Sequence, residues 1–295
     1  MSSPDYLYIA RNNFYIGNYQ TTIQEATKLT LVNENDQIER DCLIYRSNIA
    51  LQNYSFVMEE IDARPTRTAI FSAIRILAEY YASPEKREDL IQQLGVLRND
   101  EFSNSPIISV IAATIYNDQN NYELAYRTLR NPQTLEQMSI FTQTLLRMNR
   151  PDLANKIVKE MKLKDEDNVL TQLACCWVDV VLDGAHIVEA SQIYMELIDK
   201  LGQSVSLLLG LGITYLKQGK GEEAYNTFLE AYERNPNDPD VLNNLIVCCQ
   251  VIGKNEEETN KYITALSTSF PNFSTVVAMN QMKSRLQEII NKYKN

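Results

Sequence analysis

The chain has 295 residues, of which 44% are hydrophobic and 22% are charged, so it is long enough to bury a sizeable core. Its formal net charge of -10 opposes binding to nucleic acid and direct adsorption to anionic lipid, since both need clustered Lys and Arg. No apolar run typical of a signal peptide opens the sequence, and no stretch approaches the roughly 18 apolar residues of a membrane helix. We therefore expect a cytoplasmic protein.

Residues 1–104 repeat a plan of helix, turn and helix without a fixed spacing. The first copy has Gly17-Asn18 at its turn, and the second copy has Gln52-Asn53. In the third copy Ser83-Pro84 opens the second helix, because proline is favoured in the first helical turn. We predict degenerate helix pairs over this region.

Residues 105–271 hold clearer repeats of about 34 residues. Tyr116 and Ala125 keep the separation expected between a large residue of the first helix and a small residue of the second. Leu145 and Ala154 keep the same separation further along the chain. A spacing that recurs in this way predicts a solenoid of stacked helix pairs.

The clearest copy spans residues 205–238. Its glycines suggest a phosphate-binding loop, but the spacing fits neither a dinucleotide fingerprint nor a P-loop, in which Ser or Thr would follow Gly219-Lys220. The spacing matches the tetratricopeptide (TPR) pattern instead, at Leu208, Leu211, Gly212, Tyr215, Ala224, Phe228, Ala231 and Pro236. We predict that Gly212 and Ala224 lie where two antiparallel helices cross, with Phe228 covering the first helix.

Residues 272–295 have an amphipathic helical pattern and are predicted to form a C-terminal capping helix. No segment has a pattern typical of a strand. We therefore predict an all-α, TPR-like alpha-solenoid of antiparallel helix pairs that forms a right-handed superhelix. Residues 1–295 are expected to make one domain of about eight to nine pairs.

Side chains suited to catalysis or metal binding are few. The five cysteines show no CxxC spacing, and the single histidine, His186, makes a Cys/His zinc site improbable. His186 falls in a predicted turn, where exposure is the ordinary outcome. The acidic run at residues 165–167 precedes a helix, so we interpret it as helix capping. We predict no catalytic, cofactor-binding or metal-binding residue and no enzymatic activity.

Solenoids usually bind their partners along a concave face, which the first helix of each pair lines. Residues beside the core stripe of these helices are our candidate partner-binding residues: Val110, Thr114, Asn117, Cys175, Asp179, Leu182, Leu209, Ile213, Leu216, Asn243, Val247 and Gln250. This stripe has no Lys or Arg, so it lacks the basic clamp that a terminal carboxylate needs. It suits a permanent, largely apolar segment of a partner. Alternatively, neighbouring repeats fill the groove.

The sequence resembles the epsilon subunit of coatomer in several stretches, in order and spacing. These are FYIGNYQ, IYNDQNNYELAYRTL, LLRMNRPDLANKIVKEM, DEDNVLTQLACCWV and LNNLIVCCQVIGK. DEDNVLTQLACCWV is the most specific, and the resemblance covers nearly the whole chain. The stretch FLEAYERNP is closer to the general TPR consensus, and residues 30–40 and 95–105 differ freely.

The resemblance implies a non-enzymatic structural subunit of the COPI vesicle coat that stably binds the C-terminal region of the alpha subunit. It also implies a role in Golgi-to-ER retrograde and intra-Golgi transport, with a peripheral location on Golgi and COPI-coated vesicle membranes. Contact with the membrane would be indirect, through the assembled coat. No cofactor and no nucleic acid are expected. A TPR adaptor or co-chaperone that binds short peptides transiently is the alternative, and the missing basic clamp opposes it.

Overall fold

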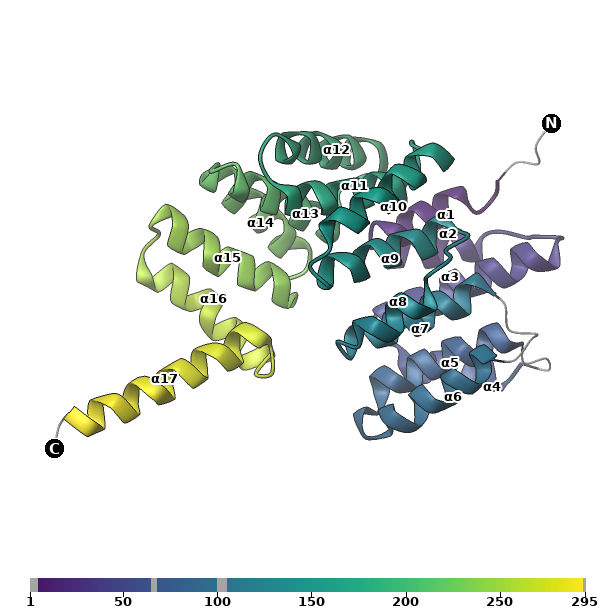
Figure 1. Ribbon diagram of the computed structural model, residues 1–295, viewed down its shortest axis with the longest axis horizontal. Helices are drawn as coiled ribbons and strands as arrows, with labels where there is room; N and C mark the ends of the chain where they lie inside the picture. Colours follow the sequence, from purple (N-terminus) through teal and green to yellow (C-terminus); the bar gives the residue numbers. More distant parts are fainter. Residues whose placement is uncertain (1–4, 65–67, 100–104, 294–295) are drawn as a thin grey trace. The chain divides into compact units, whose positions relative to one another are not determined.

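The computed structural model describes residues 5–64, 68–99 and 105–293, and every regular element among them is helical (Figure 1). The chain forms two compact units, Met1–Gly184 and Ala185–Asn295, which we call unit 1 and unit 2. The all-α, TPR-like fold is confirmed. The division into repeats within one domain stays a prediction.

The described residues of unit 1 form five helix pairs and one further helix. They are α1 (Tyr8–Tyr15), α2 (Tyr19–Thr27), α3 (Glu34–Ala50), α4 (Tyr54–Asp62), α5 (Ala69–Ala82), α6 (Arg87–Asn99), α7 (Pro106–Asp118), α8 (Tyr122–Thr128), α9 (Leu135–Arg147), α10 (Pro151–Lys164) and α11 (Val169–Leu182). A short 3-10 turn, Pro84–Lys86, leads into α6 as the Ser83-Pro84 pattern predicts.

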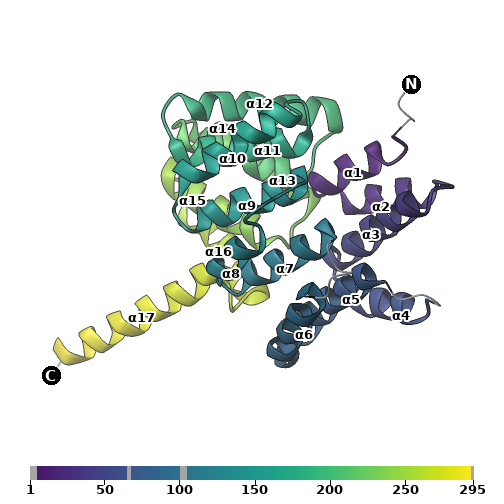
Figure 2. The same ribbon diagram turned by 45° about the vertical axis from the view of Figure 1, so that its right-hand side comes forward.

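Unit 2 contains the remaining helices, and Figure 2 shows α17 extending away from α16 at the end of the chain. They are α12 (His186–Leu201), α13 (Val205–Lys217), α14 (Gly221–Arg234), α15 (Pro239–Ile252), α16 (Glu256–Ser269) and α17 (Ser274–Tyr293). Within the described ranges, no helix combines the length and the apolar character needed to cross a membrane.

Most turns within helix pairs share one backbone conformation. In six of the described turns a residue with positive φ ends the first helix: Gly17, Gln52, Asn120, Asn149, Gly219 or Gly253. The next N–H then donates to the carbonyl five residues earlier at 2.8–3.0 Å, as Lys220 does to Tyr215 and Lys254 does to Cys249. This is the bond that closes a Schellman motif and reverses the chain tightly. The turns predicted at Gly17-Asn18, Gln52-Asn53 and Gly219 are therefore confirmed.

The two glycines of α13 let it pack closely against a neighbour on each side. A Cβ atom on Gly210 would lie 2.3 Å from the Tyr194 ring of α12, and one on Gly212 would lie 2.4 Å from the Phe228 ring of α14. Ala224 is fully buried in the same layer. The close crossing predicted at Gly212 is confirmed.

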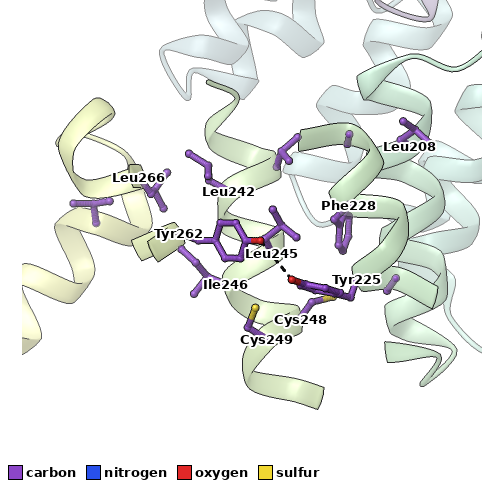
Figure 3. Packing of buried hydrophobic residues seen from close by; sticks show 14 residues of the cluster. Leu208, Tyr225, Phe228, Leu242, Leu245, Ile246, Cys248, Cys249, Tyr262 and Leu266 are labelled. Atoms are coloured by element: carbon purple, nitrogen blue, oxygen red, sulfur yellow. Dashed lines mark hydrogen bonds between the residues drawn. The ribbon is translucent and has the colours of Figure 1, made fainter. Parts of the chain in front are cut away.

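The core of unit 2 continues from this layer into α15 and α16 (Figure 3). Its buried members include Leu208, Leu245 and Leu266. The Tyr225 and Tyr262 hydroxyls lie 3.4 Å apart inside it, and Tyr225 also hydrogen-bonds the Glu258 carboxylate. A buried tyrosine that satisfies its hydroxyl in this way can fill the core without an unpaired polar group.

Candidate partner-binding site

A cavity of about 460 Å³ lies within unit 1, and we call it the inner cavity. The first helix of every pair in the unit contributes to its wall, as does α11: α1 through Tyr15, α3 through Cys42, α5 through Ile70, α7 through Ile107, α9 through Leu135 and α11 through Leu170. Because one stripe from each of these helices meets here, residues far apart in the sequence share one surface.

An ion pair between Arg46 of α3 and Glu136 of α9 sits in the wall of the inner cavity. Their side chains are only 13% and 18% exposed. The Arg46 guanidinium also lies 4.6 Å from the centre of the Phe14 ring of α1, in cation–π geometry. The Arg46 guanidinium therefore connects α3 to α1 and to α9, which belong to the second, first and fifth helix pairs of unit 1.

The surroundings of this pair favour its charged form. Burial alone would lower the pKa of Arg46, but the adjacent Glu136 carboxylate outweighs burial and raises that pKa. Burial raises the pKa of the Cys42 thiol to about 12, and burial with nearby Glu136 raises the pKa of Tyr15. Cys42 and Tyr15 therefore stay neutral near pH 7, and they offer the inner cavity weakly polar surface.

Two further cavities adjoin the inner cavity through shared residues. The aromatic cavity, about 360 Å³, shares Arg46 with it and is lined by Phe14, Tyr19, Ile49, Ala50, Gln52, Tyr54, Leu77, Tyr81, Val110, Ile111 and Thr114. The small cavity, about 150 Å³, shares Tyr81 and Thr114 with the aromatic cavity and reaches Asn117, Asp118, Ile140, Gln143 and Arg147. The three cavities thus form a chain along unit 1, which we call the inner surface.

Three sequence-predicted residues, Val110, Thr114 and Asn117, lie on this inner surface. Asn117 donates its side-chain N–H to Thr144 Oγ1 at 2.9 Å. Within the described part of the chain, the buried Oδ1 of Asn117 has no hydrogen-bond partner. A buried acceptor without a partner costs the fold free energy.

The other predicted residues lie elsewhere. On α11, Cys175 is buried, Asp179 is half-buried and Leu182 is 38% exposed, and none of them lines the three cavities. The α13 and α15 residues belong to unit 2, where Leu209, Ile213 and Leu216 are half-buried against the core, Asn243 is half-buried, and Val247 and Gln250 are exposed. Acidic substitutions in the α13 stripe would therefore test folding as well as binding.

Sequence reasoning missed Arg46 and the aromatic residues of the inner surface. The predicted stripe has no Lys or Arg, whereas the inner surface carries Arg46 with its charge met by Glu136. The repeats of residues 1–104 are degenerate, so no position in them could be assigned to an inner face. One signal was available: Arg46 directly follows the apolar run of residues 42–45 in α3.

The described ranges contain few side chains arranged for catalysis or metal binding. They contain no group of three or more His, Cys, Asp or Glu side chains arranged to hold a metal ion. His186 begins α12 with its side chain 52% exposed. The capping interpretation of residues 165–167 is wrong in detail, because Asn168 is the N-cap of α11 and accepts from the Leu170 N–H at 3.1 Å.

Comparison with known proteins gives a consistent result over nearly the whole chain. The family model described as coatomer epsilon subunit matches residues 3–294. Coatomer subunit epsilon-1 of Arabidopsis thaliana is 34% identical over 272 residues, which cover 92% of this chain and 91% of that protein. Coatomer subunit epsilon of Caenorhabditis elegans is 31% identical over 286 residues, which cover 97% of each.

Solved structures support the fold alone, since their identity to this chain is low. The crystal structure of the APC/C hetero-tetramer Cut9-Hcn1 matches 91% of this chain and 53% of its own with a TM-score of 0.65 at 12% identity. A tetratricopeptide repeat protein from Parabacteroides merdae matches 88% of this chain and 96% of its own with a TM-score of 0.60 at 12% identity.

Proposed function

The chain belongs to the coatomer epsilon subunit family, and on this basis we propose that it binds the C-terminal region of the coatomer alpha subunit through the inner surface of unit 1. As a member of the family it is a structural coat subunit that assembles with other coatomer subunits. The partner and the surface are the parts that we propose.

The observation that carries this proposal is that the three cavities adjoin one another through shared lining residues. Arg46 joins the first two, and Tyr81 and Thr114 join the second and third. A row of adjoining cavities can hold successive side chains of one inserted chain segment. Solenoids commonly bind extended partners along such surfaces.

The lining also indicates the chemistry of the segment. Apolar and aromatic side chains dominate the aromatic cavity, and Tyr54 stacks on Tyr81 with ring centres 6.3 Å apart. Glu136 already neutralises Arg46, so this guanidinium needs no carboxylate from the segment. We infer a largely apolar segment with few charges.

In the cell, we expect this binding to place the chain on Golgi membranes and COPI-coated vesicles, where it supports retrograde and intra-Golgi transport. The role is one of binding and needs no catalysis by this chain. Loss of alpha binding should shift a fluorescently tagged chain from Golgi membranes into the cytosol. The same change in a variant that binds alpha normally would contradict the proposal.

The proposal can be tested with two acidic substitutions in the inner cavity, Ile38→Asp and Ile107→Asp. Both isoleucines are half-buried and line this cavity. A bound segment would bury each new carboxylate without a partner, so the affinity for an alpha C-terminal fragment should fall at least about tenfold, or about 1.4 kcal/mol. Co-purification and calorimetric titration of the fragment measure this loss.

A matched control uses apolar residues of unit 1 that lie outside the cavities. Val32 and Leu163 are 97% and 88% exposed, so Val32→Asp with Leu163→Asp should leave binding unchanged. Circular dichroism verifies that both double variants stay helical. Full binding by a folded inner-cavity variant would mean that the partner uses another surface.

A further inference from the structure

The last helix of unit 2 leaves an apolar face exposed. Val276 of α17 is buried, but every residue from 280 to 293 is exposed. Leu286 is 58% exposed, Ile289 is 51% exposed and Tyr293 is 88% exposed. Figure 1 shows α17 leading away from α15 and α16 as a single straight helix. Its apolar side chains therefore have no cover within unit 2.

These side chains follow the spacing of a helix–helix interface. Alternating steps of three and four residues connect Met279, Met282, Leu286, Ile289 and Tyr293, and we call this row the α17 seam. Such steps repeat at 3.5 residues, which is the period of a coiled-coil contact. At 100° per residue the seam covers about 80° of the helix circumference, a narrow stripe that one partner helix can cover.

Cations border the α17 seam on both sides. Lys283 follows one edge and Arg285 the other, while Lys292 lies further round the helix on the side of Arg285, and Glu288 lies beyond them, one helical turn from both. Within the described part of the chain, none of these three cations pairs with a carboxylate. A helix with acidic residues beside its own apolar stripe would complement this arrangement.

We propose that the α17 seam docks an acidic amphipathic helix of a partner protein. A second copy of the chain fits less well, because the cations of two seams would be brought together. A bilayer fits less well too, because the seam is narrow and the chain carries a net charge of -10. This proposal is independent of the inner surface of unit 1.

A designed peptide probe tests the proposal on the full chain. The labelled probe has three heptads, with Leu at the two core positions and Glu at the flanking positions, and a matched probe carries Lys in place of Glu. Fluorescence anisotropy should show binding of the acidic probe only. The double variant Leu286→Ser and Ile289→Ser should bind the acidic probe at least about tenfold more weakly. The control pair Gln281→Ser and Gln287→Ser, outside the seam, should not.

Charge reversal separates the proposal from its alternatives. Lys283→Glu with Arg285→Glu should weaken binding of the acidic probe and allow the basic probe to bind. Failure of the acidic probe to bind, or equal binding by the seam variant, would overturn the proposal. So would a Leu286-dependent dimer in sedimentation equilibrium, which would assign the seam to a second copy. Seam-dependent sedimentation with phosphatidylserine vesicles, without probe binding, would assign it to lipid.

Discussion

Similar helix pairs build two different structures: they surround cavities at the inner surface of unit 1, and they pack closely around α13 in unit 2. In unit 2 the Tyr194 and Phe228 rings occupy the space beside Gly210 and Gly212, so the helices meet closely. In unit 1 bulky and charged side chains hold the first helices around cavities, and Arg46 bridges them. The clearest TPR signature thus marks the tightest packing, and the degenerate repeats share the lining of the inner surface with residues 105–170.

The largest loss of stability should come from a substitution that leaves the buried Arg46 charge in unit 1 without its partner. The substitution Glu136→Ala leaves Arg46 partly buried beside Phe14 without its carboxylate partner. We therefore expect unit 1 to lose about 3 kcal/mol of unfolding free energy. Trp177 of α11 is the only tryptophan and lies in unit 1. Its fluorescence during urea unfolding reports this loss.

Two controls sharpen this result. Glu123 and Arg127 form an exposed pair on α8, with side chains 71% and 68% exposed, so Glu123→Ala should cost less than about 1 kcal/mol. Replacing the buried pair together, Arg46→Met with Glu136→Leu, should recover much of the loss, because no uncompensated charge remains. Equal losses from Glu136→Ala and Glu123→Ala would mean that the buried pair does not hold unit 1 together.

The close packing of unit 2 predicts a smaller loss for Gly212→Leu. A Cβ atom there would lie 2.4 Å from the Phe228 ring, so overpacking should cost about 2 kcal/mol in a thermal melt followed by circular dichroism. Gly95 of α6 is the matched control, since a Cβ atom there would have no neighbour within 4 Å. Gly95→Leu should be neutral or stabilise by up to about 1 kcal/mol. An unchanged melting temperature for Gly212→Leu would contradict the close crossing.

The features predicted from sequence are those with local causes. The turns at Gly17 and Gly219 follow from residues that accept positive φ, and the crossing at Gly212 follows from the 34-residue spacing. The inner cavity could not be predicted in this way, because Arg46 and Glu136 are 90 residues apart in the sequence. The contact between Arg46 and Glu136 depends on how successive helix pairs stack, and the sequence of a single repeat does not determine that stacking.

The smallest expected effect concerns the turns. Gln52 adopts φ of 65° in the turn of unit 1 where unit 2 has Gly219, and glycine has no Cβ to strain this conformation. Gln52→Gly should therefore stabilise unit 1 by up to about 1 kcal/mol, measured by Trp177 fluorescence in urea. Asn149→Gly is the comparison and should change stability less, because asparagine tolerates positive φ. A loss of stability in Gln52→Gly would show that the Gln52 side chain makes a needed contact.

Site-specific photocrosslinking tests the use of the inner surface most directly. A benzoylphenylalanine in place of Tyr81 would stand where the aromatic and small cavities meet, and one in place of Val247 would stand on the predicted stripe of unit 2. A third in place of Leu163 serves as the exposed control. With the alpha C-terminal fragment bound, we predict crosslinks from position 81 alone. Crosslinks from position 247 or 163, with none from position 81, would contradict binding at the inner surface.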